Sequence, residues 1–112
     1  MEHVTVVVLI LTTVPAVSRA DTIARSLVDE RLAACVNVIP GLTSIYRWQG
    51  EREEASECLL VIKTDETRYA ELERRVLELH PYTVPEVLAL PVERGAPAYM
   101  EWLKDSVAIE GR

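Results

Sequence analysis

The sequence predicts an α+β domain of the ferredoxin-like split βαβ type, in which two helices cover one face of an antiparallel sheet. Three observations predict this class. The elements follow the order β-α-β-β-α-β with one further helix, two stretches carry apolar residues at helical spacing, and the middle strands form a hairpin. A chain of 112 residues has the length of one domain, which we assign to residues 1–108.

The first strand is predicted at residues 4–13 and the first helix from Ser18 onward. Residues 4–13 are β-branched and aliphatic with little alternation, which is typical of a central strand buried on both faces. Ser18, with Asp21 three residues later, resembles a capping box and predicts that the helix begins there. The apolar stripe of this helix comprises Ile23, Ala24, Leu27, Val28 and Leu32.

The second and third strands are predicted at residues 34–48 and 58–64, joined by a turn over residues 49–52. Pro40-Gly41 interrupts the second strand and requires a bulge or an edge position there, because proline cannot donate to the ladder. A hairpin of this kind places Cys58 roughly opposite Thr43. We therefore do not expect Cys58 to pair with Cys35.

The C-terminal part of the chain predicts a helix, a strand and a last helix. The helix over residues 65–79 ends at His80, because the following Pro81 disfavours helical backbone in the residue before it. A fourth strand is predicted at residues 87–92, and Pro97 suits the first turn of the last helix. Residues 109–112 read Ile-Glu-Gly-Arg, a protease recognition sequence, and are predicted to be a tail left by cloning.

Composition and charge exclude several classes of function. The net charge of −6 works against binding to nucleic acid and to anionic membranes. The predicted central strands also carry none of the aromatic side chains on which an RNA-binding sheet stacks bases. No activated nucleophile is visible, so we do not expect an enzyme. The chain shows neither a signal-peptide pattern nor a membrane-spanning apolar run, and we expect a cytoplasmic protein with reduced cysteines.

The length of the second strand predicts self-association. Fully extended, residues 34–48 span about 50 Å, whereas a domain of this size is about 35 Å across. The hairpin must therefore bend or overhang, and an overhang exposes Tyr46, Trp48 and unpaired backbone. A symmetric partner normally covers such an edge. The alternative is a bent hairpin that curls over its own domain.

Several long motifs resemble one known family. They are Ala34-Cys35-Val36-Asn37, Pro40-Gly41, Ser44-Ile45-Tyr46-Arg47-Trp48-Gln49-Gly50, Ile62-Lys63-Thr64 and His80-Pro81-Tyr82-Thr83-Val84-Pro85-Glu86, followed by Tyr99 and Trp102. In this order they resemble the divalent-cation tolerance protein family (CutA) over nearly the whole chain. The resemblance implies a homotrimer with a PII-like architecture, in which long hairpins form intersubunit sheets. It also implies a role in tolerance to copper and other divalent cations, without an established catalytic activity.

His80 is the first candidate metal ligand, because neutral imidazole commonly binds copper and zinc near pH 7. Its structural alternative is a helix C-cap. Some members of the family carry a Cys and a second His where this chain has Thr12 and Leu79, so we expect copper(II) or another divalent cation to be weakly held. Cys35 is a possible soft ligand, with simple core packing as its alternative.

A second candidate site is an intersubunit cleft formed by Trp48, Glu57, Lys63, Tyr82 and Glu86. Glu57 and Lys63 lie six residues apart and so share one face of the third strand. The resemblance supports placing these residues together, and the alternative is a structural ion pair with interface packing. Three functions remain open: weak binding of divalent cations at His80, a PII-like signalling module that binds a small anionic ligand through Lys63, and a structural trimer that anchors other proteins.

Overall fold

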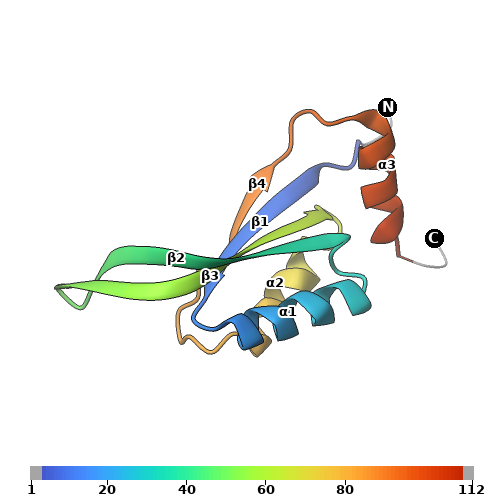
Figure 1. Ribbon diagram of the computed structural model, residues 1–112. Coiled ribbons are helices and arrows are strands. Elements are labelled where there is room, and N and C mark those ends of the chain that lie inside the picture. Colours follow the sequence, from blue (N-terminus) through green and yellow to red (C-terminus); the bar gives the residue numbers. More distant parts are fainter. Residues whose placement is uncertain (1–3, 110–112) are drawn as a thin grey trace.

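Four strands form one antiparallel sheet in the order β2-β3-β1-β4, and α1 and α2 cover one of its faces (Figure 1). The computed structural model describes residues 4–109. The elements are β1 (Val7–Val14), α1 (Val17–Asp29), β2 (Cys35–Trp48), β3 (Glu51–Asp65), α2 (Tyr69–Leu79), β4 (Leu88–Pro91) and α3 (Pro97–Ser106). This topology confirms the split βαβ fold that the order of elements predicted.

The core lies between the sheet and the two helices and is aliphatic. Ile10, Leu60 and Ile62 point from the sheet toward Ile23 and Leu27 of α1 and are fully buried with them. Leu72 and Val76 of α2 complete this cluster. The predicted stripe of the first helix is confirmed at Ile23, Ala24 and Leu27, which recur at helical spacing and are buried. Val28 is 41% exposed, so its place in the stripe was wrong, and Leu32 is buried but follows the end of α1.

The other face of the sheet carries rows of apolar side chains, and α3 packs against part of it. Residues that pair directly across antiparallel strands point to the same side, so Leu11, Val61 and Leu88 form one row. Leu9 and Leu90 continue the surface, and Leu88 and Leu90 are about half exposed. We call this surface the open face. α3 contacts β3 and lies beside the end of that strand (Figure 1). There Lys63 Nζ lies over the Tyr99 ring.

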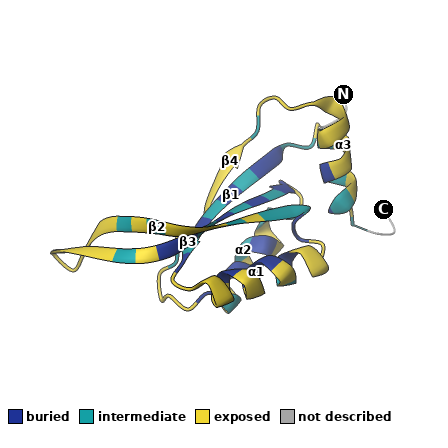
Figure 2. Ribbon diagram, viewed as in Figure 1, coloured by how far each residue is buried: buried dark blue, intermediate teal, exposed yellow. Residues whose placement is uncertain are grey.

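The β2–β3 hairpin projects from the domain, as the length of its strands predicted. The molecule measures 50 × 26 × 22 Å, and Figure 2 shows the projecting half of the hairpin almost entirely exposed. A β-bulge between Ile39 and Leu42 bends β2 at Pro40-Gly41, which confirms the predicted interruption. Gly41 adopts a φ of +78°, a backbone conformation that favours glycine.

The predicted element boundaries were wrong at several places. β3 begins at Glu51 instead of residue 58, because Gln49 and Gly50 adopt positive φ and form a tight turn that lets Trp48 pair with Glu51. α2 begins at Tyr69 instead of residue 65, since Asp65 still pairs with Val7 in the sheet.

Smaller corrections concern the other strands and the start of the first helix. β1 begins and ends later than the predicted residues 4–13, β2 begins one residue later than predicted, and β4 is shorter by one residue at each end. α1 begins at Val17, and no side chain caps its first turn. The capping box at Ser18 is therefore wrong, and the Ser18 carbonyl instead accepts a hydrogen bond from Thr22 within the helix. Apart from Ile109, the predicted tail lies outside the described residues.

Candidate functional site

His80 follows the last residue of α2 and is 7% exposed. The backbone N–H of Tyr82 donates to Nδ1 at 3.1 Å, so Nδ1 is the acceptor and Nε2 carries the ring proton. Nε2 lies 2.8 Å from the Thr13 carbonyl oxygen and donates to it. Both ring nitrogens are thus engaged, and the imidazole joins the end of α2 to the end of β1. To bind a metal, the ring must give up one of these two hydrogen bonds.

The surroundings of His80 offer few additional metal ligands. Within residues 4–109, no three side chains of His, Cys, Asp or Glu lie close enough together to hold a metal ion. Structural zinc sites, for example, usually have four protein ligands, and catalytic zinc sites have three. The residues of one chain therefore fit only a weak metal site, or one completed by another copy.

The base of the hairpin contains a hollow of about 550 Å³, which we call the hairpin hollow. It lies where β2 and β3 leave the domain, next to the loop between α2 and β4. Its lining residues are Thr13, Ser44, Ile45, Tyr46, Trp48, Glu57, Tyr82, Thr83, Val84 and Glu86. Four of the five residues predicted for a cleft, namely Trp48, Glu57, Tyr82 and Glu86, thus line one cavity.

Glu57 is the most deeply buried acidic side chain of this hollow, with 5% of its surface exposed. The Tyr82 hydroxyl donates to Glu57 Oε2 at 2.6 Å and so ties β3 to the loop after α2. Burial, followed by this hydrogen bond and the charge of Glu57, raises the pKa of Tyr82 well above its ordinary value. The phenol therefore stays protonated and remains a donor throughout the physiological pH range.

Lys63 lies away from this hollow in a single chain. Six residues of extended strand separate it from Glu57, a distance of about 20 Å. Its Nζ instead lies 6.0 Å from the centroid of the Tyr99 ring in α3. Sequence spacing correctly put both side chains on one face of β3, but a shared face does not bring them into contact.

Cys35 is half-buried and lies directly across from Lys63 on the open face. Cys58 is buried in the core cluster, and both cysteines are free. The pairing of Leu42 with Glu57 puts Cys58 beside the bulge, slightly short of its predicted place opposite Thr43. The two thiols lie on opposite faces of the sheet.

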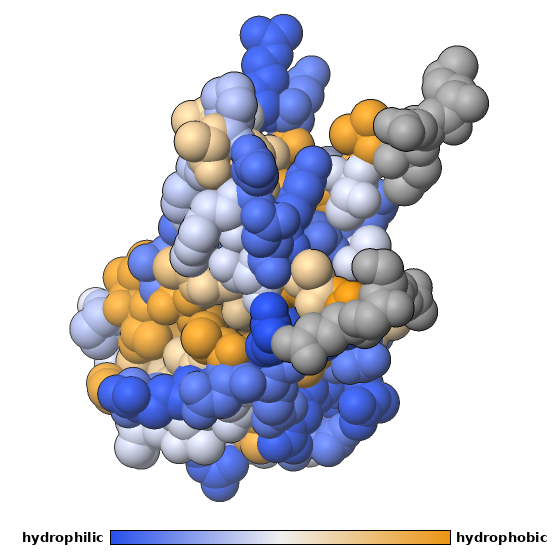
Figure 3. Space-filling model, turned by 90° about the vertical axis from the view of Figure 1, so that its right-hand side faces the viewer, coloured by the Kyte–Doolittle hydropathy of each residue, from blue (hydrophilic) through white to orange (hydrophobic). Residues whose placement is uncertain are grey.

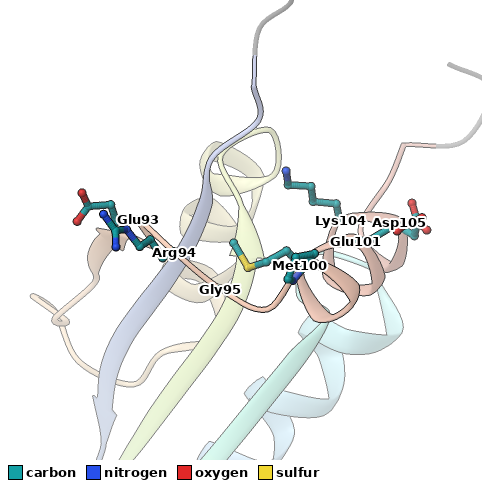
Figure 4. A pocket seen from close by; sticks show the side chains of 8 residues that line it. Glu93, Arg94, Gly95, Met100, Glu101, Lys104 and Asp105 are labelled. Atoms are coloured by element: carbon teal, nitrogen blue, oxygen red, sulfur yellow. The ribbon is translucent and has the colours of Figure 1, made fainter.

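A second hollow, of about 710 Å³, lies between the loop before α3 and that helix (Figure 4). Sequence reasoning did not anticipate it. Met100 fills the space beside Gly95, where an added Cβ would lie 2.5 Å from the Met100 sulfur. Figure 4 shows Glu93 and Arg94 at one end and Lys104 at the other, and their charged ends diverge. No group of polar atoms converges there on a ligand.

The exposed surface also carries hydrophobic side chains. Figure 3 shows the largest group of them on one side of the view, between hydrophilic surfaces. Within residues 4–109, no helix is long and apolar enough to cross a membrane. Hydrophobic side chains exposed in this structure include Ile45, Val84 and Leu88.

Comparison with known proteins gives a consistent result. A family described as "CutA1 divalent ion tolerance protein" matches residues 8–106. The "Divalent-cation tolerance protein CutA" of Thermus thermophilus is 56% identical over 97 residues, which cover 87% of this chain and 94% of that protein. A solved structure of a divalent cation tolerance protein from Thermus thermophilus superposes with a TM-score of 0.89 at 53% identity, covering 91% of this chain and 99% of the other.

Two further relatives differ in length and in the compartment that their names give. "Protein CutA, chloroplastic" of Arabidopsis thaliana is 44% identical over 99 residues, which cover 88% of this chain but 54% of that protein. The chain thus spans about half the length of that relative. The structure of the "Periplasmic divalent cation tolerance protein CutA" of Archaeoglobus fulgidus has a TM-score of 0.88 at 35% identity, over 91% of this chain and 99% of the other.

Proposed function

The chain belongs to the CutA1 divalent ion tolerance protein family, and on that premise we propose that it is a homotrimeric, cytoplasmic protein of divalent-cation tolerance. The observation that carries this proposal is the family match over residues 8–106. We further propose that the protein acts by binding and not by catalysis, in line with the ion tolerance that names the family.

The open face and the hairpin support the homotrimer. Apolar rows such as Leu11, Val61 and Leu88 lie on a face that no element of residues 4–109 covers completely. Tyr46 and Trp48 of the hairpin are likewise about half exposed. Burial of such surface is the main driving force of association. A closed ring of three copies would cover the open face by the same contact repeated three times and would place the hairpin beside a neighbouring copy.

Weak binding of copper(II) or another divalent cation is the second part of the proposal. His80 supplies an imidazole, and Cys35 supplies a half-buried thiol on another part of the sheet. Because His80 must exchange a hydrogen bond for the metal, and because one chain provides few ligands around it, the affinity is low. A ligand set completed by a second copy would raise it.

The decisive experiment titrates copper(II) into the purified protein by calorimetry, after light scattering has measured the mass of the particle. His80→Ala and Cys35→Ala are titrated in parallel, and circular dichroism verifies that each variant is folded. Binding that is lost only in His80→Ala assigns the metal to His80. Copper binding that both variants retain would remove His80 and Cys35 as ligands.

The cytoplasmic location is tested separately, because two relatives carry "chloroplastic" and "periplasmic" in their names. Fractionation of the native cells, followed by detection with an antibody, should place the protein with soluble cytoplasmic markers. Recovery with periplasmic or organelle markers would contradict this part of the proposal.

A small anionic ligand is not favoured by the hollow of a single chain. Its lining contains Glu57 and Glu86, and no Lys or Arg within residues 4–109 contributes to it. A trimer that only anchors other proteins would bind neither copper nor a small molecule. Absence of binding in both the copper titration and the small-molecule titration described below would therefore favour this structural role.

A further inference from the structure

The hairpin hollow contains a carboxylate that lacks a cationic partner. Glu57 is 5% exposed, and Tyr82 donates to only one of its oxygens, Oε2. Among residues 4–109, no side chain forms an ion pair with Glu57, and none donates to its Oε1. A charge that is withdrawn from water normally has an opposite charge or several donors around it. Among residues 4–109 the one fully buried side-chain polar atom without a partner is Thr12 Oγ1, so Glu57 Oε1 is open to the hollow. A cation in the hollow would complement this carboxylate.

Aromatic rings lie beside this carboxylate. Trp48 and Tyr46 line the hollow from β2, and Tyr82 lines it from the loop after α2. The Tyr82 hydroxyl contacts Glu57 at 2.6 Å, and Tyr46 lines the same hollow. The faces of Trp and Tyr rings attract cations, and the attraction is strongest when the cation is poorly hydrated.

The composition of the lining distinguishes between kinds of ligand. An anion would meet Glu57 and Glu86 without a Lys or Arg from the described residues. A metal ion would find no group of three His, Cys, Asp or Glu ligands within residues 4–109. An organic cation needs neither, because one carboxylate neutralises its charge while the rings contact its carbon substituents.

We propose that the hairpin hollow binds a small organic ammonium ion, with its nitrogen near Glu57 and its alkyl groups against Trp48, Tyr46 and Tyr82. A volume of about 550 Å³ suits a small molecule of this kind. The Tyr82 hydroxyl holds the carboxylate in place and leaves Oε1 for the ligand. His80 adjoins this site, since its ring centroid lies 4.9 Å from that of Tyr82, but it does not line the hollow. The proposal does not depend on the proposed binding of copper.

The experiment compares two probes of equal shape and different charge by calorimetry on the wild-type protein in its native oligomeric state. Choline carries a quaternary ammonium group, and 3,3-dimethyl-1-butanol replaces that nitrogen by carbon. We expect choline to bind at least about tenfold more tightly than the neutral alcohol, because only choline complements Glu57. In a Trp102→Phe background, choline should also change the fluorescence of the remaining tryptophan, Trp48.

Two glutamine variants locate the charge. Glu57→Gln keeps the shape of the side chain and should weaken choline binding by about tenfold or more. Glu101→Gln removes the same charge from the other hollow, beside α3, and should leave the affinity within about twofold. If Glu57→Gln fails to fold, the comparison of choline with the neutral alcohol on the wild-type protein still tests whether the hollow recognises a positive charge.

Three results would overturn the proposal. Equal affinity for choline and the alcohol would show an apolar hollow that does not recognise charge. Equal losses in Glu57→Gln and Glu101→Gln would show a non-specific effect of net charge. Absence of choline binding at millimolar concentration would show that the hollow is closed in the native assembly or that another copy already supplies its cation.

Discussion

Two buried threonines lie on neighbouring strands and differ in what their hydroxyl groups contact. Thr64 donates its hydroxyl hydrogen to the Leu32 carbonyl at 2.7 Å, which ties β3 to the segment that follows α1. Thr12, on β1, is also fully buried, but its Oγ1 has no hydrogen-bond partner among residues 4–109. A buried hydroxyl without a partner loses its hydration and regains nothing.

The first prediction follows from this difference. Thr12→Val removes an unsatisfied hydroxyl without changing the volume and should raise the free energy of unfolding by about 1 kcal/mol. Thr64→Val is the matched control. It should lower the free energy of unfolding by about 1–3 kcal/mol, because the Leu32 carbonyl then loses its donor. Urea denaturation measures both values. A destabilised Thr12→Val protein would mean that the hydroxyl has a partner, such as a buried water.

The residues of the hairpin hollow were predicted from sequence only in part. The family resemblance supported a cleft that contains Glu57, Tyr82 and Glu86, and the length of the second strand indicated that Tyr46 and Trp48 are exposed. The contact between Tyr82 and Glu57 joins positions 25 residues apart, and only the packing of the loop against β3 decides it. The two hydrogen bonds of His80 were likewise hidden, because they depend on how the end of α2 packs against β1.

At the scale of single elements, the hairpin depends on one bulge and one turn. The bulge at Pro40-Gly41 changes the register between Ile39 and Leu42, so the outer half of the hairpin leaves the plane of the sheet. Gly41 has a φ of +78°, and an added Cβ would meet no atom within 4 Å. Any effect of a substitution at Gly41 therefore comes from backbone strain and not from a clash.

The second prediction tests that strain. Gly41→Ala should lower the free energy of unfolding by about 1–2 kcal/mol, which is the typical cost of a left-handed conformation for a residue with a Cβ. Gly41→Asn should cost less, because asparagine tolerates this conformation better than alanine. Thermal denaturation of the three proteins provides the comparison. Equal stability of the alanine variant and the wild type would show that the bulge relaxes without strain.

At the scale of the whole molecule, a projecting hairpin and a partly covered apolar face suit an assembly better than a monomer. The longest dimension of 50 Å is about twice the other two. Val61 is half-buried at the centre of the open face, between Leu11 and Asn37 on the neighbouring strands. Its side chain is absent from the core between the sheet and the helices.

The third prediction concerns the homotrimer. Val61→Asp should dissociate the protein into single chains, because three buried carboxylates would face one another across the assembly. Val28→Asp, at an exposed position of α1, should leave the mass unchanged. Light scattering measures both. A wild-type particle should also show a melting temperature that falls over about a hundredfold dilution, since dissociation and unfolding are then linked.

A trimer that persists in Val61→Asp would show that the open face is not the interface. A melting temperature independent of concentration would count against linked dissociation, unless dissociation is slower than the scan.

The order of elements, the aliphatic core, the bulge at Pro40-Gly41 and the overhanging hairpin were determined by the sequence itself. Their causes are local: apolar spacing, the missing N–H of proline and the rise per residue of a strand. Tertiary structure alone decided the full length of β3, where residues 51–56 are largely exposed and carry no apolar pattern, because pairing with β2 holds them. It also decided the partners of Glu57, Lys63 and His80, since each contact joins elements that are distant in the chain and depends on how those elements pack.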